Sequence, residues 1–322
     1  MQTKIVEINS RKPEIDKIKT AAKIIKSGGL IAFPTETVYG LGANALNKSA
    51  IKKIFIAKGR PFDDPLIVHI ADIQDLNKLA KNIPQEAIKL AEKFWPGPLT
   101  MVLEKSKLVP DVATAGLKTV AIRMPKNNIA LELIKASNTS IAAPSANTFS
   151  KPSPTSSQHV FNDLSGKIPM IIDGGQTKIG LESTVIDLTS KPYTILRPGK
   201  ITAKELKKVL GKIKIHPFKS KKPKSPGMKY KHYSPNAKVI LIYGNENKIL
   251  EIQNQYEKMH KRTSIIWADK NIEFLAKNLF KKFREFDDKK MDIIIVQGVE
   301  EKGLGMALMN RIKKSASKII RV

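Results

Sequence analysis

Two short segments far apart in the chain combine cations with small polar groups that could hold the phosphates of a nucleoside triphosphate. Lys58 and Arg60 lie two residues apart in Lys-Gly-Arg-Pro, and Ser145 and Asn147 have the same spacing in Pro-Ser-Ala-Asn. In an extended stretch, side chains two residues apart project to the same side. Arginine offers a planar set of donors for bidentate phosphate contacts, whereas lysine acts as a mobile point charge. The segments therefore predict a phosphate site that lacks a Walker loop.

Each segment alone is more typical of an exposed turn, because lysine and arginine usually lie in solvent. The surrounding sequence favours a site. A polar run over 34–42, Pro-Thr-Glu-Thr-Val-Tyr-Gly-Leu-Gly, follows the apolar run 30–33, and the small apolar residues 141–143 directly precede the second segment. Polar clusters thus recur where strands are expected to end.

The net charge favours a polyanionic substrate or partner. Lysine and arginine number 57 against 29 aspartates and glutamates, which gives a formal net charge of +28. So large a basic excess is typical of proteins that bind nucleic acid or nucleotides, although dispersed basic residues also serve solubility.

The chain contains no cysteine, which excludes disulfide bonds, thiolate catalysis and cysteine-ligated zinc. Lys4 places a charge where a signal peptide needs an apolar core, and no segment is apolar and long enough to span a bilayer. We therefore expect a soluble, cytoplasmic protein without membrane association. We also expect a monomer, since no long heptad or apolar edge requires a partner.

The order of apolar and amphipathic segments predicts an α/β fold in two domains. Residues 1–210 should form a mixed sheet with helices, and 237–322 a smaller Rossmann-like α/β domain. The Lys/Pro-rich stretch 211–236 between them is predicted to be an extended linker. Strands are expected at 30–33, 66–70, 99–104, 120–124, 140–143, 169–172, 183–188, 193–197, 239–243, 264–267 and 293–296. Helices of the first domain are expected at 13–26, 48–57, 84–94, 127–136, 156–164 and 202–209.

Other motifs of nucleotide and hydrolytic chemistry are missing from the sequence. It has no P-loop pattern and no Gly-x-Ser-x-Gly elbow, and its five histidines show no paired metal-ligand spacing. Residues 303–308, Gly-Leu-Gly-Met-Ala-Leu, match two thirds of a dinucleotide fingerprint and are better explained as a tight strand-to-helix turn. We expect no protein-ligated metal; Mg²⁺ would enter with substrate phosphates.

Two polar residues lie inside apolar strand patterns, and each has two interpretations. His69, in Leu-Ile-Val-His-Ile, is more often a core residue than a ligand. Arg123, in Val-Ala-Ile-Arg-Met-Pro, needs an anion to offset its desolvation. Either a substrate carboxylate or phosphate, or a structural carboxylate, would provide that anion.

Ten motifs in order then carry a family resemblance: PTETVYGLG, KGRP, DPLIVHI, WPGPLT, TVAIRMP, APSAN, KPSPT, IDGG, GLESTVID and LRPG. They closely resemble the YrdC-like domain of L-threonylcarbamoyl-AMP synthases. The linker string SPGMKYKHYSP and the C-terminal GLGMALMNR are similar to the longer, two-domain form, so the resemblance covers essentially the whole chain. One departure is Thr148-Phe149-Ser150-Lys151, where many members have Ser-Gly after Ser-Ala-Asn.

The resemblance implies a nucleotidyltransferase that makes L-threonylcarbamoyladenylate and pyrophosphate from L-threonine, bicarbonate and ATP, for modification of the tRNA adenosine next to the anticodon. Lys58 and Arg60 would be the catalytic cations. ATP would contact Lys58, Arg60, Thr119, Ser145, Asn147, Ser153, Arg197, Tyr230 and His232. Threonine would contact Thr35, His69, Arg123, the backbone at Ala143, and Ser183. Tyr230 and His232, on the linker, would fold over the nucleotide as a lid.

Two other functions compete with this interpretation. A non-catalytic protein that binds tRNA or double-stranded RNA would suit the net charge, but it gives no reason for Thr35, Ser145, Asn147 and Ser183 at strand ends. A hydrogenase-maturation carbamoyl transferase uses a related domain but carries cysteine-rich fingers, which this chain lacks. Candidate partners of the synthase are tRNA and the threonylcarbamoyl transferase complex.

Overall fold

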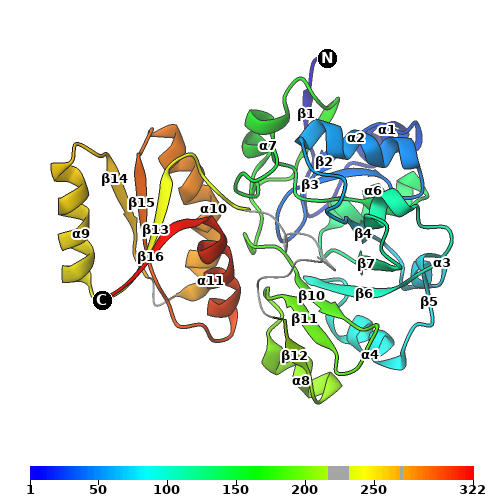
Figure 1. Ribbon diagram of the computed structural model, residues 1–322. Coiled ribbons are helices and arrows are strands. Elements are labelled where there is room, and N and C mark those ends of the chain that lie inside the picture. Colours follow the sequence, from blue (N-terminus) through cyan, green and yellow to red (C-terminus); the bar gives the residue numbers. More distant parts are fainter. Residues whose placement is uncertain (217–231, 269–270) are drawn as a thin grey trace.

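The computed structural model describes residues 1–216, 232–268 and 271–322, and they form two sheets side by side (Figure 1). The larger, mixed sheet has the order β1-β9-β2-β3-β8-β4-β7-β6-β10-β11-β12, with β5 paired to β6. Its strands are β1 (Lys4–Glu7), β2 (Ile31–Phe33), β3 (Gly40–Asn44), β4 (Ile67–His69), β5 (Ala80–Lys81), β6 (Leu99–Lys105), β7 (Thr119–Arg123), β8 (Ile141–Ala142), β9 (Met170–Asp173), β10 (Thr184–Asp187), β11 (Thr194–Arg197) and β12 (Lys214–Ile215).

Amphipathic helices cover this sheet, and its buried apolar residues form two large clusters and one small one. They are α1 (Ile15–Lys26), α2 (Lys48–Lys58), α3 (Leu76–Leu79), α4 (Gln85–Phe94), α5 (Asp111–Thr114), α6 (Asn128–Ser137), α7 (Ser157–Leu164) and α8 (Ala203–Leu210), with a 3₁₀ turn at Ile73–Asp75. Side chains cap the starts of α2, α6, α7 and α8: for example, Asn47 accepts from the Ala50 amide, and Thr202 with Glu205 forms a capping box.

The smaller sheet is entirely parallel, in the order β14-β15-β13-β16. Its strands are β13 (Lys238–Tyr243), β14 (Thr263–Ile266), β15 (Ile293–Gln297) and β16 (Ala316–Arg321), and its helices are α9 (Glu246–Lys258), α10 (Ile272–Asp288) and α11 (Leu304–Ser315). Helix α9 lies on one face, while α10 and α11 lie on the face toward the larger sheet (Figure 1). Helices on both faces are the expected cover for a parallel sheet.

The predicted fold class, a mixed α/β sheet followed by a smaller α/β unit, is confirmed. The residues 303–308 form a turn and the start of α11, as expected. Strands β1, β3 and β5 of the larger sheet were not expected, and two further strands were missed: the smaller sheet has a fourth strand, β16, and the larger sheet continues to β12, inside the stretch predicted to be linker. Both strands are short or exposed edges with few apolar residues, so their sequences carry little strand signal.

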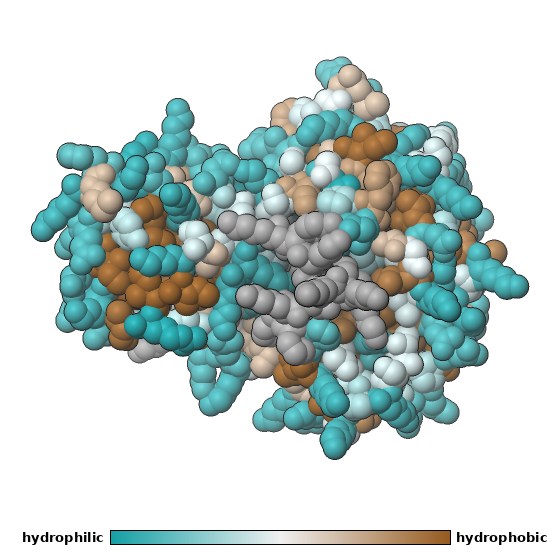
Figure 2. Space-filling view, viewed as in Figure 1, coloured by the Kyte–Doolittle hydropathy of each residue, from teal (hydrophilic) through white to brown (hydrophobic). Residues whose placement is uncertain are grey.

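Hydrophilic side chains cover most of the face shown in Figure 2, on both domains, as the composition predicts. Within the described residues, no helix is long and apolar enough to cross a membrane.

The two domains approach closely at Gly180, which precedes β10 and faces α10. Its φ is +79°, and a Cβ at this position would lie 2.4 Å from the Lys277 carbonyl oxygen and 2.5 Å from the Lys277 Cα. Both atoms are backbone, so neither can move without shifting the helix. The lack of a side chain at Gly180 therefore lets the second domain dock.

The substitution Gly180→Ala should destabilise the protein by about 2 kcal/mol or more, since it adds left-handed strain and a backbone clash. Urea unfolding of the variant measures the loss. Gly116→Ala is the matched control, because Gly116 has a φ of +77° and no atom of the described residues lies within 4 Å of its Cβ position. Equal losses in the two variants would show that the domain contact at Gly180 contributes nothing.

Candidate active site

Helix α2 positions the first cationic pair. It ends at Lys58, and Gly59 follows with a φ of 62°, the left-handed conformation that terminates helices. The chain turns there, so that Arg60 is directed back toward the sheet, where it ion-pairs with Asp64 at 2.9 Å and donates to the Pro65 carbonyl at 2.9 Å. Lys58 and Arg60 are both buried, at 2% and 7% exposure.

Lys58 joins the two segments singled out in the sequence. Its Nζ donates to the backbone carbonyls of Ser145 and Asn147. The Asn147 amide donates to the Thr148 and Lys151 carbonyls at 2.7 and 3.0 Å, which holds the turn closed. Ser145 forms an isolated β-bridge with Gly40. A Cβ added to Gly40 would lie 3.3 Å from the Cβ of Ala143, so the two segments pack closely here. The predicted convergence of these segments is therefore present.

Ser150 occupies the position where the family motif departs from Ser-Gly. Its φ is 70°, a conformation that glycine adopts at less cost than serine. Ser150 thus keeps a glycine-like backbone, and its carbonyl accepts from the Ser234 amide at 2.8 Å. The adjacent Phe149 contacts His232 edge to face at 5.3 Å between ring centroids.

Neighbouring strands place His69 beside Arg123. Strands β4 and β7 are parallel, with His69 in register with Arg123 at their carboxyl ends. Arg123 ion-pairs with Glu36 at 2.7 Å and donates to the Thr37 hydroxyl at 2.9 Å. Of the two anions considered for Arg123, the structural carboxylate is therefore present. Burial and the Arg123 charge lower the pKa of His69 to about 3, so this imidazole is neutral at pH 7.

Two further strand ends supply the other side of the site. Arg197, the last residue of β11, donates to the Ser183 carbonyl and hydroxyl, each at 3.1 Å. The Ser183 hydroxyl also pairs with that of Thr100 at 2.7 Å. Burial lowers the pKa of Arg197 from its ordinary value. In the loop that follows β2, the Thr35 hydroxyl donates to the Val38 carbonyl at 2.7 Å, which stabilises the turn.

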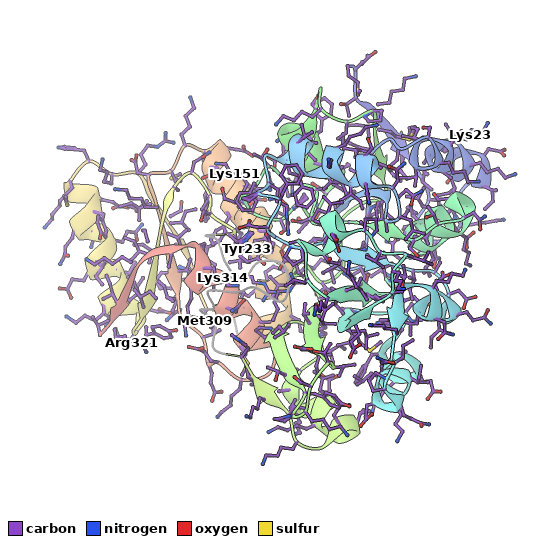
Figure 3. The ribbon with its side chains drawn as sticks, turned by 45° about the vertical axis from the view of Figure 1, so that its right-hand side comes forward. Lys23, Lys151, Tyr233, Met309, Lys314 and Arg321 are labelled. Atoms are coloured by element: carbon purple, nitrogen blue, oxygen red, sulfur yellow. The ribbon has the colours of Figure 1, made fainter. Side chains whose placement is uncertain are left out.

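These elements converge on one cavity, which is open to solvent. Most of its charged lining is cationic. The lining residues are Thr35, Thr37, Val38, Tyr39, Gly40, Arg60, Ile67, His69, Arg123, Ala143, Pro144, Ser145, Glu182, Arg197, His232 and Tyr233. Figure 3 shows Tyr233 at the junction of the two domains, and with His232 it brings the end of the linker to one side of the cavity.

The predicted site residues divide into three groups. Thr35, Arg60, His69, Arg123, Ala143, Ser145, Arg197 and His232 line the cavity. Lys58, Ser153 and Ser183 lie behind the lining and hydrogen-bond to it, whereas Asn147 is linked to it through Lys58, which donates to the Asn147 carbonyl. Thr119 begins β7, four residues before Arg123 and opposite Glu104, so the structure does not bring it into the cavity. Tyr230 lies outside the described residues.

Sequence reasoning missed the acidic residues of the site. Glu36 pairs with Arg123, and Glu182 lines the cavity while it accepts from the Ser153 hydroxyl. Burial alone would raise the pKa of Glu182, but Arg311 and Arg197 outweigh it and lower that pKa. The available signal was a glutamate beside hydroxyl residues in each of two motifs, PTETVYG and GLESTVID.

The cavity offers poor ligands for a metal held by the protein. Within the described ranges, no group of three or more histidine or acidic side chains could hold a metal ion. The acids near the cavity, Asp64, Glu36 and Glu182, each pair with an arginine. The site is therefore suited to anionic oxygens rather than to a cation.

Comparison with known proteins assigns the family. A family model described as "Telomere recombination", of the Sua5, YciO and YrdC proteins, matches residues 23–199, and one described as "Threonylcarbamoyl-AMP synthase, C-terminal domain" matches 201–317. The threonylcarbamoyl-AMP synthase of Pyrococcus abyssi is 51% identical over 99% of this chain and 100% of its own length. The chain belongs to the threonylcarbamoyl-AMP synthase family.

Other members support the same assignment. The threonylcarbamoyl-AMP synthase of Bacillus subtilis is 43% identical over 98% of this chain and 96% of its own. The crystal structure of P. abyssi Sua5 complexed with L-threonine superposes with a TM-score of 0.96, at 50% identity over 99% of each chain. A P. abyssi Sua5 variant with an adjacent histidine and tyrosine replaced by alanine gives the same TM-score.

As a threonylcarbamoyl-AMP synthase family member, the chain is an ATP-using enzyme of tRNA modification. The synthase interpretation is confirmed, and the non-catalytic RNA-binding alternative is not supported.

Proposed function

We propose that the cavity holds ATP beside L-threonine and joins them through bicarbonate. The observation that carries this proposal is the convergence of Arg60, Arg123 and Arg197 with small hydroxyl groups in one hollow. Pyrophosphate release by the pure protein, given ATP, bicarbonate and labelled threonine, tests it. Release should depend on both threonine and bicarbonate, and release without either would contradict the proposal. Serine or glycine in place of threonine then tests the amino-acid pocket.

The triphosphate belongs beside Lys58, Arg60, Ser145 and Arg197. In the described structure the Lys58 ammonium binds two carbonyls of the Ser145 turn, and burial, with a contribution from Arg60, lowers its pKa well below its ordinary value. A bound phosphate would favour the charged form and attract this flexible side chain. Asn147 would shape the turn, and Ser153 would act through Glu182. Thr119 has no cavity contact to support its assignment to ATP.

The amino acid belongs beside Thr35, His69, Arg123, Ala143 and Ser183. The P. abyssi protein has been crystallised with L-threonine, which supports threonine as the substrate here. Arg123 is fixed by Glu36 and Thr37 and still lines the cavity, so its guanidinium can meet the substrate carboxylate without a change of rotamer. Because its pKa is lowered, His69 would be neutral, and it would contact the amino acid without contributing a charge.

The chemistry needs no protein nucleophile. Threonine nitrogen and bicarbonate form a carbamate with loss of water, and a carbamate oxygen attacks the α-phosphorus. The bond from that phosphorus to the β-phosphate bridging oxygen breaks, and pyrophosphate leaves. The protein would position both substrates and neutralise the charge that develops on the pyrophosphate oxygens. Lys58 and Arg60 are placed for that role.

Mg²⁺ would accompany ATP. Because the acids around the cavity pair with arginines, the residues present do not form a site that holds the ion on its own. Triphosphate oxygens and water would supply its ligands.

We also propose that the end of the linker acts as a lid. His232 lines the cavity, 3.7 Å from Asp64, and burial lowers its pKa well below its ordinary value. The Ser150–Ser234 hydrogen bond and the ring of Phe149 hold this segment over the site. A mixed anhydride hydrolyses when water reaches it, so a cover protects the product. Tyr230, outside the described residues, is assigned to the same lid.

The substitution His232→Ala should lower threonylcarbamoyladenylate synthesis by on the order of 10²-fold, as expected when substrates lose their alignment. Chromatography of product and free AMP measures synthesis and hydrolysis together. Thermal unfolding should be nearly unchanged. His260→Ala, at an exposed site in the second domain, is the control. Wild-type turnover in both variants would remove the lid from the mechanism.

Partners follow from the reaction. The product would pass to a threonylcarbamoyl transferase complex that acts on tRNA, and we expect that transfer in the cytoplasm. The net charge of +28 supports contact with tRNA.

A further inference from the structure

A buried arginine of the second domain reaches the wall of the active-site cavity. Arg311, on α11, is 0% exposed. Its Nε pairs with Glu182 at 2.9 Å, and its NH1 donates to the Pro198 carbonyl at 2.7 Å. Both partners belong to the first domain. Its guanidinium carbon also lies 5.7 Å from the centre of the Tyr233 ring.

The carboxylate that Arg311 binds is itself part of the site. Glu182 lines the cavity, and the next residue, Ser183, holds Arg197 through two hydrogen bonds. One Glu182 oxygen binds Arg311, and the other accepts from Ser153. Both carboxylate oxygens of Glu182 are therefore engaged by Arg311 and Ser153.

An acid in a triphosphate site is unfavourable unless its charge is compensated. Left alone, Glu182 would repel the phosphates and compete with them for Arg197. A buried, hydrogen-bonded guanidinium removes that competition.

Arg311 also bears on the lid. The Tyr233 ring lies between Arg311 and Phe280, on which it stacks with centroids 5.2 Å apart. The aromatic residue adjacent to His232 is thus packed against the second domain.

We propose that Arg311 is a positioning residue of the active site, through which the second domain neutralises Glu182 and anchors Tyr233. This inference rests on the proposed function but assigns the second domain a part in it. The first domain supplies the groups that contact the substrates, and Arg311 keeps Glu182 and Tyr233 in the arrangement that those groups require.

The interface contains a second ion pair that serves as a control. Arg284, on α10, pairs with Asp163 at 2.9 Å and donates to the Pro152 carbonyl. Its side chain and that of Asp163 are 11% and 12% exposed. None of these three residues lines the cavity. Loss of Arg284 should therefore weaken docking without disturbing Glu182.

The experiment compares Arg311→Met with Arg284→Met in the full-length protein. Steady-state pyrophosphate release gives kcat and KM for ATP and for threonine, and thermal unfolding reports docking. We expect Arg311→Met to lower kcat/KM for ATP by on the order of 10²-fold, with a smaller effect on the KM for threonine. Arg284→Met should lower the unfolding temperature, because it leaves Asp163 without its cation at a largely buried site, and it should leave kcat/KM within about twofold.

Two further variants separate charge from packing. Glu182→Gln combined with Arg311→Met removes the uncompensated acid, and it should recover at least tenfold of the lost kcat/KM. Arg311→Lys keeps the charge and should lose less activity than Arg311→Met. If Arg311→Met does not fold, the kinetics of Arg311→Lys provide the comparison with Arg284→Met instead.

Equal kinetic losses in Arg311→Met and Arg284→Met, or no recovery in the double variant, would show that Arg311 only docks the domains. A different result would contradict the proposed function itself. In that case pyrophosphate release by the wild-type protein would not depend on threonine and bicarbonate, whatever the variants do.

Discussion

Replacing Lys58 with methionine is expected to lower threonylcarbamoyladenylate synthesis by about 10³-fold, in line with the loss of one charge that stabilises a transition state. Methionine keeps the length and apolar stem of lysine but cannot donate to the Ser145 and Asn147 carbonyls or to phosphate. The KM for ATP should rise as well, because the ammonium would contact the triphosphate before and during reaction. Pyrophosphate release at saturating threonine and bicarbonate measures both changes.

The same substitution at Lys52 provides the control. Lys52 lies on the same helix, α2, but is exposed. Lys52→Met should retain wild-type kinetics, since surface substitutions rarely perturb a buried site. A Lys58→Met enzyme with near-normal kcat and KM would contradict the assignment of Lys58 to the phosphates.

The second large effect is on stability. The substitution Arg123→Met leaves Glu36 buried without its cation, which should reduce the free energy of unfolding by about 3–5 kcal/mol. Urea denaturation followed by circular dichroism measures the loss. Threonine binding by the variant, measured by calorimetry, should also fall below detection, since Arg123 is the residue proposed for the substrate carboxylate.

A double variant separates the two effects. Glu36→Gln removes the stranded charge, so Arg123→Met with Glu36→Gln should regain much of the lost stability and still fail to bind threonine. If threonine binding returned along with stability, Arg123 would serve the fold alone. Its guanidinium would then have no part in substrate recognition.

Most of the regular elements could be predicted from local pattern. Helix α4, expected at 84–94, is observed at Gln85–Phe94, and strand β6, expected at 99–104, is observed at Leu99–Lys105. Apolar periodicity is strong in both, and their faces pack against one core. Strand β16, in contrast, is an edge whose residues are mostly exposed, so tertiary pairing with β13 decides its conformation.

The site could be predicted where a short motif places charged or hydroxyl residues just after a helix or strand, as at Arg60 after α2 and Ser145 after β8. It could not be predicted where a partner comes from elsewhere in the chain. Nothing near Arg123 in sequence points to Glu36, and nothing near Arg311 points to Glu182, 129 residues away. Burial of such charges depends on long-range packing, which short-range periodicity does not report.

Helix α2 reaches the proposed phosphate site with its last residue, not its first. The end of a helix exposes carbonyl oxygens with partial negative charge, whereas its beginning offers amide donors that attract anions. Lys58 and Arg60 must therefore outweigh an unfavourable backbone field. An inhibitor for this site should carry full negative charges toward these two side chains, because the neutral acceptor groups that suit a P-loop would find few amide donors to bind.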